Sequence, residues 1–286
     1  MKILMTGSTG FVGRYIANKL CVEYQLYLPV RNMEKAQKVL NCRKNIFLIP
    51  FTEHLSVLVE KSKPDIVINL LGILKENKKE GSTFYKVHFE FTKSLVDGAK
   101  NAGVKKFIQM SALGADKKSK SEYMKTKALA EEYLIKSGLS YNIFRPSIIM
   151  GKEQKLFSDL KRFSKIAPFY IAPKGKVQPV NIYDVRDCFL KALDSFDNVI
   201  FELCGDKVIT YKYLFKFALK YIGVNRPVVE IPRGALLFFI PFFSLFPDPP
   251  MTKDQYYMLE KDNICSGKFK GVKDILGSVR DAFLFD

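Results

Sequence analysis

Residues 2–13 read Lys-Ile-Leu-Met-Thr-Gly-Ser-Thr-Gly-Phe-Val-Gly, an apolar run followed directly by three spaced glycines. The run predicts a strand, and the helical spacing that starts at Phe11 predicts a helix. Between them, Gly7 permits a tight turn, Gly10 lets the backbone approach a pyrophosphate, and Gly13 lets the helix pack on the strand. Amide groups at the helix start then face the phosphates. The alternative is a glycine turn that serves packing alone. The expected dinucleotide contacts in this turn are Gly7, Ser8, Thr9, Gly10, Phe11, Val12 and Gly13.

The first half of the chain alternates between strand and helix patterns. Further strands are expected at 25–30, 46–49, 65–70, 106–110 and 141–144, and helices at 33–40, 84–102 and 122–136. The fourth strand, Asp65-Ile-Val-Ile-Asn-Leu70, is almost continuously apolar, which is typical of a parallel sheet covered on both faces. Alternation at this spacing predicts right-handed crossovers and an α/β fold with a Rossmann-type doubly wound parallel sheet.

Beyond Pro146 the alternation loosens. Helices are expected at 156–166, from an Asp184 N-cap to Leu193, at 211–222 and at 253–259, with extended chain at 177–182 and 201–204. We therefore expect residues 1–150 to form an NAD(P)-binding core, with strand and helix contributions from about 177–204. Residues 151–286 are expected to form a smaller α+β region for substrate or partner.

Charge is the unusual part of the composition, because 46 Lys and Arg stand against 29 Asp and Glu, a net +17. Nucleic acid, an anionic membrane surface or a lysine-rich proteome would each account for it. The lysines are spread along the chain, and neither basic runs interleaved with aromatics nor zinc-finger spacings occur. The sequence therefore argues against specific nucleic-acid binding.

The sulfur and imidazole groups point to no metal site. Two isolated histidines, His54 and His88, are too few for a typical zinc site, and each is interpreted as a surface or packing residue. Five scattered cysteines without Cys-x-x-Cys predict packed thiols in a reducing compartment, with neither disulfides nor zinc. Because Met1 leads straight into the first strand and no apolar run could span a bilayer, a cytoplasmic location is expected. The cysteines are Cys21, Cys42, Cys188, Cys204 and Cys265.

Three residues are candidates for catalysis: Ser111, Tyr123 and Lys127. Tyr123 and Lys127 form Tyr-x-x-x-Lys within an expected helix, so both side chains share one face. An ammonium close to a phenol favours phenolate, which would lower the pKa of Tyr123 and suit it to general acid/base work. Ser111 follows the fifth strand, where ligands bind in open α/β sheets, and could hydrogen-bond the same carbonyl oxygen. The alternative is an ordinary amphipathic helix with a solvated lysine.

Two further positions bear on the cofactor. Arg31 closes the second strand, where an acidic residue would accept hydrogen bonds from ribose hydroxyls; an arginine suits a 2′-phosphate instead. NADP(H) is therefore favoured over NAD(H), although Arg31 could be one more surface base. After the fourth strand, Leu70 and Leu71 lead to Gly72, which would let the backbone pass near the nicotinamide, or could simply end the strand.

Together these residues resemble the short-chain dehydrogenase/reductase superfamily, and most closely its atypical branch around subunit nine of the complex I alpha subcomplex, bacterial members included. The resemblance implies a bound NADP(H), a Rossmann core, a smaller substrate region and association with respiratory or quinone-related membrane machinery. Pro146, in the marker Arg145–Gly151, is a further expected cofactor contact. Pro50-Phe-Thr52 replaces the acidic residue that often holds adenine. The markers are the glycine turn, Arg31, Asn69–Gly72, Lys106–Ala115, Tyr123 to Lys127, Arg145–Gly151, Gln178–Val185, Pro249–Gln255 and Asp262-Asn263.

The resemblance leaves the activity open. In the mitochondrial subunit the cofactor is structural rather than turned over, whereas this chain keeps Ser111, Tyr123 and Lys127. One hypothesis is an NADP(H)-dependent oxidoreductase acting on a hydrophobic carbonyl or quinone-like substrate. The alternative is a non-catalytic NADP(H)-binding accessory or assembly protein of a respiratory, complex I-like membrane complex. A nucleotide-sensing regulator is a third.

The stretch 234–250 is strongly apolar and contains Pro241, which would kink a helix. If exposed, it would be an adhesive patch for a membrane or a partner, and a protein of net +17 would be drawn to anionic lipid. The alternative is that it fills the core between the two regions. The first interpretation places the protein on the inner face of the plasma membrane.

Overall fold

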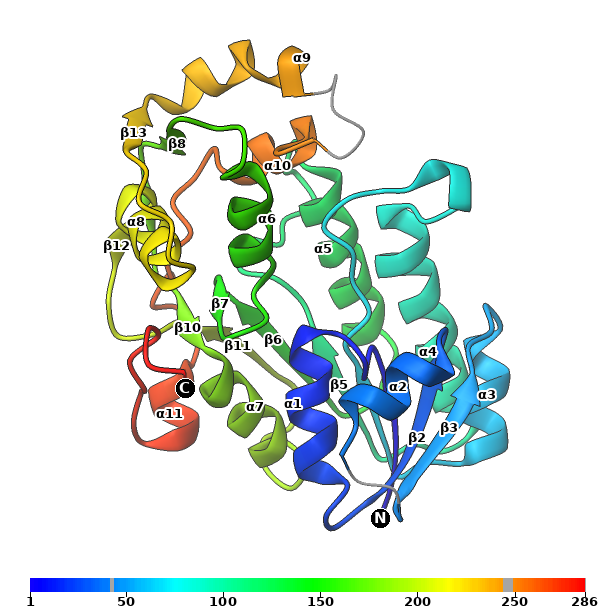
Figure 1. Ribbon diagram of the computed structural model, residues 1–286. Helices are drawn as coiled ribbons and strands as arrows, with labels where there is room; N and C mark the ends of the chain where they lie inside the picture. Colours follow the sequence, from blue (N-terminus) through cyan, green and yellow to red (C-terminus); the bar gives the residue numbers. More distant parts are fainter. Residues whose placement is uncertain (42–43, 244–248, 286) are drawn as a thin grey trace.

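A seven-stranded sheet forms the centre of the molecule. The structure is a computed structural model that describes residues 1–41, 44–243 and 249–285. The strand order is β11-β6-β5-β4-β1-β2-β3, and each neighbouring pair is parallel (Figure 1). This is the expected Rossmann-type sheet. Its strands are β1 (Lys2–Thr6), β2 (Gln25–Val30), β3 (Ile46–Pro50), β4 (Ile66–Asn69), β5 (Lys106–Met110), β6 (Tyr141–Pro146) and β11 (Val199–Leu203).

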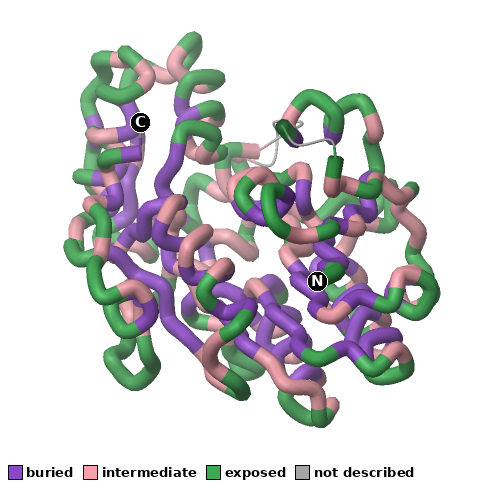
Figure 2. Tube along the Cα trace, turned by 90° about the horizontal axis from the view of Figure 1, so that it is seen from below, coloured by how far each residue is buried: buried purple, intermediate pink, exposed green. Residues whose placement is uncertain are grey.

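Helices cover both faces of this sheet, because its strands are apolar on both sides. In β1, Ile3 belongs to the core under α1, α2 and α7, whereas the next residue, Leu4, belongs to the core under α3 and α4. Figure 2 shows the resulting buried centre and exposed rim. The helices are α1 (Phe11–Leu20), α2 (Met33–Val39), α3 (Leu55–Ser62), α4 (Phe91–Asn101), α5 (Glu122–Ile135) and α7 (Ile182–Lys191).

A smaller α+β region follows β6. It pairs short strands: β7 (Ile149–Met150) with β10 (Val180–Asn181), β8 (Tyr170–Pro173) with β13 (Val228–Ile231), and β9 (Lys176–Val177) with β12 (Ile209–Thr210). Its helices are α6 (Lys155–Phe163), α8 (Tyr211–Tyr221), α9 (Ile240–Phe243), α10 (Lys253–Met258) and α11 (Val272–Leu276), and a 3-10 helix η3 spans Arg233–Phe238. Among the described residues, none of the helices is long and apolar enough to cross a membrane.

Two local expectations were wrong in detail. The helix expected from an Asp184 cap begins at Ile182, because the Asn181 side chain accepts the amide of Tyr183 and offers a cap earlier in the chain. Asp184 is instead 1% exposed and ion-paired with Arg280 at 2.6 Å. The helix expected at 84–102 opens with a π-helical turn, η2 (Tyr85–Glu90), before α4.

The cysteine prediction was also wrong. Cys204, just after β11, and Cys265 form a disulfide with a Cα–Cα distance of 6.1 Å. The pair is 61 residues apart in sequence, and nothing local shows that the chain returns to this strand end. Cys21 and Cys188 are buried free thiols, while Cys42 lies outside the described residues.

Candidate functional site

The glycine turn takes the form that its spacing predicts. Gly7 has φ 71°, in the left-handed region that glycine tolerates, and its carbonyl accepts the amide of Gly10 at 3.0 Å. A Cβ on Gly13 would lie 2.1 Å from that same carbonyl oxygen, so only glycine lets α1 start this close to the turn. The α1 start has no side-chain cap and no acidic residue in its first turn. The helix start is therefore suited to bind an anion.

The polar atoms around the turn fit a dinucleotide. Within the described part of the chain, the hydroxyls of Ser8 and Ser111 are buried and have no hydrogen-bond partner. A buried hydroxyl without a partner is costly, and a ligand that bonds it removes that cost. The uncapped start of α1 suits a diphosphate, and Ser111 suits a carbonyl or hydroxyl oxygen.

A buried hydrogen-bond network fixes the loop after β4. The Asn69 side chain accepts from Thr6 at 2.7 Å and from the amide of Leu71 at 3.1 Å. It also donates to Thr92 at 2.9 Å and to Gln109 at 3.0 Å. Strand β4 thus holds the following backbone in register with β1 and β5, beside the glycine turn.

A pocket of about 440 Å³ brings most of the expected residues together. Among them are the catalytic candidates Ser111, Tyr123 and Lys127. The remaining lining residues that the sequence predicted are Gly7, Gly10, Phe11, Val12, Gly13, Leu70, Gly72 and Pro146. Four expected contacts are not part of the lining: Ser8, Thr9, Arg31 and Leu71.

Lys127 is buried beside the loop after β4, with an exposed fraction of 4%. Its ammonium donates to the carbonyls of Leu71 and Met110, each at 3.2 Å, and a Cβ on Gly72 would lie 3.3 Å from Nζ. Burial lowers the pKa of Lys127 to about 8, against the opposing charge of Glu131. Leu71 therefore serves the site through its carbonyl, which holds the lysine.

The expected lowering of the Tyr123 pKa is wrong in direction for this structure. Burial raises the pKa of Tyr123 to about 12, and the negative charge of Asp254 adds to the rise. The Lys127 ammonium is bonded to two backbone carbonyls. Tyr123 is therefore a protonated phenol at neutral pH, the form that can donate a proton.

His88 is a site residue whose role the sequence did not reveal. It is 1% exposed on the π-helical turn, and its ring meets that of Tyr123 edge-on at 5.0 Å between centroids. Nε2 accepts the amide of Ile73 at 3.1 Å, which leaves Nδ1 to donate to Thr126 at 3.0 Å. Burial first, and then the charge of Lys127, lowers the pKa of His88 to about 2, so the ring stays neutral. His88 is therefore a packing residue, as expected, and the side chain that it packs against is the catalytic candidate Tyr123.

Arg31 lies at the end of β2, away from the pocket lining. Its guanidinium sits 5.0 Å from the centre of the Phe51 ring, and Phe51 follows β3. Within the described ranges, no carboxylate forms an ion pair with it. An exposed, stacked arginine beside the carboxyl ends of β2 and the edge strand β3 can bind a phosphate.

The prediction from sequence did not include the pocket residues that come from the C-terminal part of the chain. Met258, at the end of α10, and Leu259 and Asn263 beyond it reach the pocket. Ser147 donates to the Asn263 side chain at 2.6 Å. The only signal was the Asp262-Asn263 marker, which had no assigned role. In the described chain, no cluster of three or more His, Cys, Asp or Glu residues could hold a metal ion.

Residues 7–165 match the family model described as NAD(P)H-binding. The chain belongs to that family. It is 26% identical over 280 residues to subunit 9 of the NADH dehydrogenase [ubiquinone] 1 alpha subcomplex of Arabidopsis thaliana, covering 90% of this chain and 67% of that protein. It is 31% identical over 241 residues to the photosystem II assembly factor Ycf39 of Cyanophora paradoxa, covering 82% and 73%. This NAD(P)H-binding protein is thus an atypical short-chain dehydrogenase/reductase, related to complex I subunit 9 and to Ycf39.

Solved structures give the same fold. The crystal structure of gox2253 aligns with a TM-score of 0.73 over 98% of this chain and 94% of that one, at 21% identity. UDP-glucose 4-epimerase of Thermotoga maritima aligns with a TM-score of 0.67 over 81% and 86%, at 22% identity. At such identities the likeness concerns the fold of this NAD(P)H-binding protein alone.

Proposed function

We propose that this protein is an NADP(H)-dependent oxidoreductase that acts on a hydrophobic carbonyl or quinone-like substrate. One observation carries the proposal: Ser111, Tyr123 and Lys127 line the same pocket as the glycine turn. Residues 1–150, joined by β11 and α7, would bind the cofactor, and residues 151–286 would complete the substrate site.

Each of the three residues has a distinct part. Lys127 would bind the nicotinamide ribose and set the local charge, while the Ser111 hydroxyl would orient the substrate oxygen. Tyr123 would give that oxygen its proton, or take it in the reverse direction. When bound, the nicotinamide supplies or accepts the hydride.

The lining favours an uncharged substrate. Apart from backbone groups, hydroxyls and the amide side chains of Gln154 and Asn263, it is built from apolar side chains. Lys127 is the charged residue among the lining residues that the structure describes. A nucleotide-sugar substrate would need further cationic or amide groups for its diphosphate. The apolar lining residues include Phe11, Ile73, Leu74, Met110, Leu113, Met124, Ile148, Met258 and Leu259.

The test is the ligand that co-purifies, identified by mass spectrometry, followed by turnover with quinones and aldehydes. The proposal expects NADP(H) in the native protein and oxidation of NADPH by at least one apolar carbonyl or quinone. A protein that binds no adenine dinucleotide would refute it.

The second candidate is a non-catalytic NADP(H)-binding accessory or assembly protein of a respiratory, complex I-like membrane complex. It is favoured by the relatives, one named as a complex I subunit and the other as a photosystem II assembly factor. Tight NADPH binding without turnover on any substrate would favour this candidate over the first.

Arg31→Ala is expected to weaken NADPH binding by about 1.5–3 kcal/mol, the scale of a hydrogen bond to a charged group, and to leave NADH binding nearly unchanged. The reason is that only NADPH carries a 2′-phosphate for this guanidinium. Calorimetric titration with both cofactors measures it, and Lys191→Ala, an exposed base on α7, is the control. Equal losses for both cofactors would contradict the role of Arg31.

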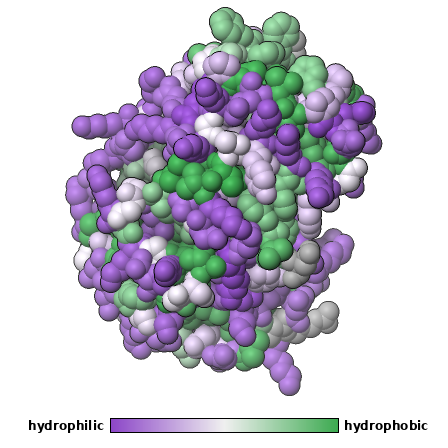
Figure 3. All heavy atoms as spheres, turned by 90° about the vertical axis from the view of Figure 1, so that its left-hand side faces the viewer, coloured by the Kyte–Doolittle hydropathy of each residue, from purple (hydrophilic) through white to green (hydrophobic). Residues whose placement is uncertain are grey.

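We also propose that the apolar arm, residues 233–243, docks on an anionic membrane surface or on a membrane complex. Phe238 is 79% and Phe242 67% exposed, so most of the arm does not fill a core. Apolar side chains gather at the top of the face in Figure 3, at the height of η3 and α9 in Figure 1. Residues 244–248 of the expected apolar stretch lie outside the described residues.

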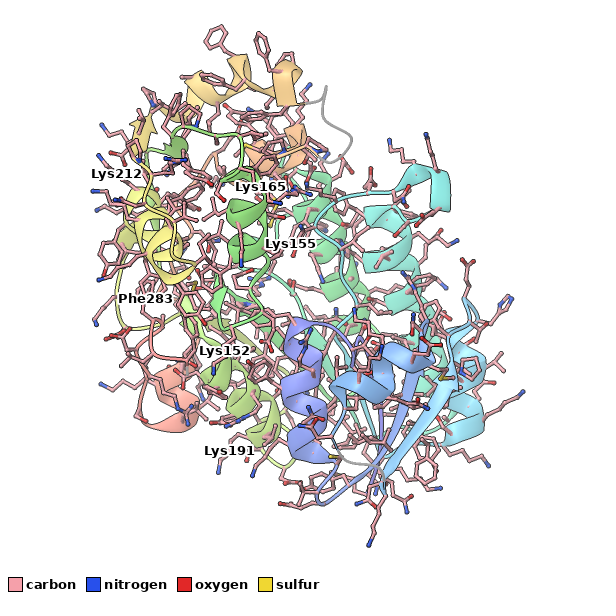
Figure 4. All side chains as sticks on the ribbon, in the orientation of Figure 1. Lys152, Lys155, Lys165, Lys191, Lys212 and Phe283 are labelled. Carbon is pink, nitrogen blue, oxygen red and sulfur yellow. A yellow bond between two sulfur atoms is a disulfide. The ribbon has the colours of Figure 1, made fainter. Side chains whose placement is uncertain are left out.

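Lysines would add an electrostatic attraction to an anionic surface. Lys152, Lys155 and Lys165 follow one another along α6 and the residues that flank it (Figure 4). A cytoplasmic position, peripheral on the inner face of the plasma membrane, would suit both features, because that leaflet is anionic. Because Cys204 and Cys265 form a disulfide, the scattered cysteines no longer indicate a reducing compartment.

Phe238→Asp with Phe242→Asp is expected to lower binding to vesicles containing anionic lipid at least about tenfold, because two exposed aromatic rings that would enter the bilayer are replaced by charges. Co-sedimentation measures it. Val22→Asp changes a side chain that is equally exposed, at 68%, just beyond the C-terminal end of α1, and should have little effect. Unchanged binding of the double variant would remove the membrane-docking role.

A further inference from the structure

The C-terminal strap, residues 249–265, joins the smaller region to α5, the helix that carries Tyr123 and Lys127. It contains α10, which contacts α5, and it brings Met258, Leu259 and Asn263 to the pocket (Figure 1). Its sequence markers, Pro249–Gln255 and Asp262-Asn263, have no part in the function proposed so far.

Asp254 connects the strap to the first turn of α5. Its Oδ1 accepts the amide of Glu122 at 2.6 Å, and its Oδ2 accepts the Ser121 hydroxyl at 2.9 Å and the amide of Tyr123 at 3.4 Å. Ser121 is itself the N-cap of α5 and accepts the amide of Met124. A carboxylate more than a hundred residues away in sequence therefore completes the cap and faces the positive end of the helix.

Contacts beside Asp254 and at the far end of the strap hold this carboxylate in place. Around Asp254, a capping box between Thr252 and Gln255 orders the first turn of α10. Gln255 also donates to the carbonyl of Leu74, at 3.4 Å, in the loop after β4. At the far end, the Cys204–Cys265 disulfide anchors the strap beside β11.

We propose that Asp254 is a positioning residue that sets the place of the Tyr123 hydroxyl in the pocket by capping α5 from the strap. Tyr123 lies in the first turn of α5 and Lys127 one turn later, so the start of this helix fixes both. The proposal rests on the proposed oxidoreductase function.

Electrostatics give the proposal a readout that packing alone would not move. Among the described residues near Tyr123, the charged or titratable groups include Lys127 and Glu122 on its own helix, His88 from the π-helical turn, and Asp254 from the strap. Loss of the Asp254 charge would lower the pKa of Tyr123, since that charge raises it. Titration of the tyrosinate absorbance should therefore find a lower pKa for Tyr123 in Asp254→Asn than in the wild type. The alkaline limb of activity does not report this pKa, because Lys127, with a pKa of about 8, loses its charge first.

The test compares Asp254→Asn and Asp254→Glu with the control Asp274→Asn, which removes the carboxylate that accepts the amide of Gly271 at the start of α11. For Asp254→Asn we expect kcat to fall about tenfold, KM and the NADPH Kd to change less than about twofold, and the pKa of Tyr123 to fall. Asp254→Glu should keep the wild-type pKa of Tyr123 while kcat falls. The control should change neither.

An unchanged kcat in Asp254→Asn, or an equal fall in the control, would overturn the proposal. Titration of tyrosinate absorbance, with Tyr123→Phe subtracted, gives the Tyr123 pKa without any turnover; an equal pKa in wild type and Asp254→Asn would also overturn it. If Asp254→Asn does not fold, Asp254→Glu provides the test. A wild-type kcat in Asp254→Glu would show that Asp254 does not position Tyr123. Absence of NADPH binding in the wild type is a separate result, and it would refute the proposed function instead.

Discussion

Tyr123→Phe is expected to lower kcat for carbonyl reduction about 10²–10⁴-fold, the range for loss of a positioned general acid. The phenol is buried, with a pKa of about 12, so it is protonated at neutral pH and can donate. Phenylalanine keeps the ring contacts with Phe84 and His88 and removes only the proton. NADPH affinity should stay within about twofold, because the hydroxyl takes no part in holding the dinucleotide. Steady-state kinetics and fluorescence titration measure the two quantities.

Tyr133→Phe is the matched control for this variant. Tyr133 lies later on α5 and donates to Asp97 at 2.6 Å, away from the pocket. Its loss should leave kcat close to the wild-type value. If Tyr123→Phe turned over at the wild-type rate, the general-acid role would be wrong, and the accessory-protein candidate would gain support.

Gly13→Ala is expected to abolish measurable NADPH binding and to destabilise the fold by about 1–3 kcal/mol or more, the cost of overpacking. The added Cβ would lie 2.1 Å from the Gly7 carbonyl oxygen and 2.8 Å from the Ser8 Cα, and both are backbone atoms of the turn. Relief requires α1 to move away from the turn, and the anion site moves with it. Thermal unfolding and calorimetric titration measure both effects.

Gly234→Ala controls for the glycine-to-alanine change itself, because a Cβ there would meet no atom within 4 Å. We expect it to bind NADPH as the wild type does. A Gly13→Ala protein that still bound NADPH normally would show that the turn serves packing alone.

Local pattern was sufficient to predict the central sheet and the core of the candidate site. Apolar strands such as β4 bury both faces, and this alone requires helices on each side. The glycine spacing at 7, 10 and 13 predicts the turn, since each position has a steric reason that acts within a few residues. Tyr123 and Lys127 share a helix face at i, i+4, so the sequence could place them together.

Contacts between distant segments could not be predicted in this way. No periodicity links Cys204 to Cys265, Ser147 to Asn263, or Asp254 to the start of α5. The lowered Tyr123 pKa was predicted from Lys127 alone, whereas burial and Asp254 decide its direction. His88 could be read as a packing residue, but its contact with Tyr123 depends on the π-helical turn meeting α5.

By itself, the sequence determined the order of strands and helices in the first half of the chain, the form of the glycine turn and the shared helix face of Tyr123 and Lys127, because each depends on neighbours within one or two turns of chain. The tertiary structure decided the electrostatic state of Tyr123, the strap that completes the α5 cap, the disulfide and the exposure of the arm. These depend on which distant segments exclude water from one another, and that is settled only when the whole chain has packed.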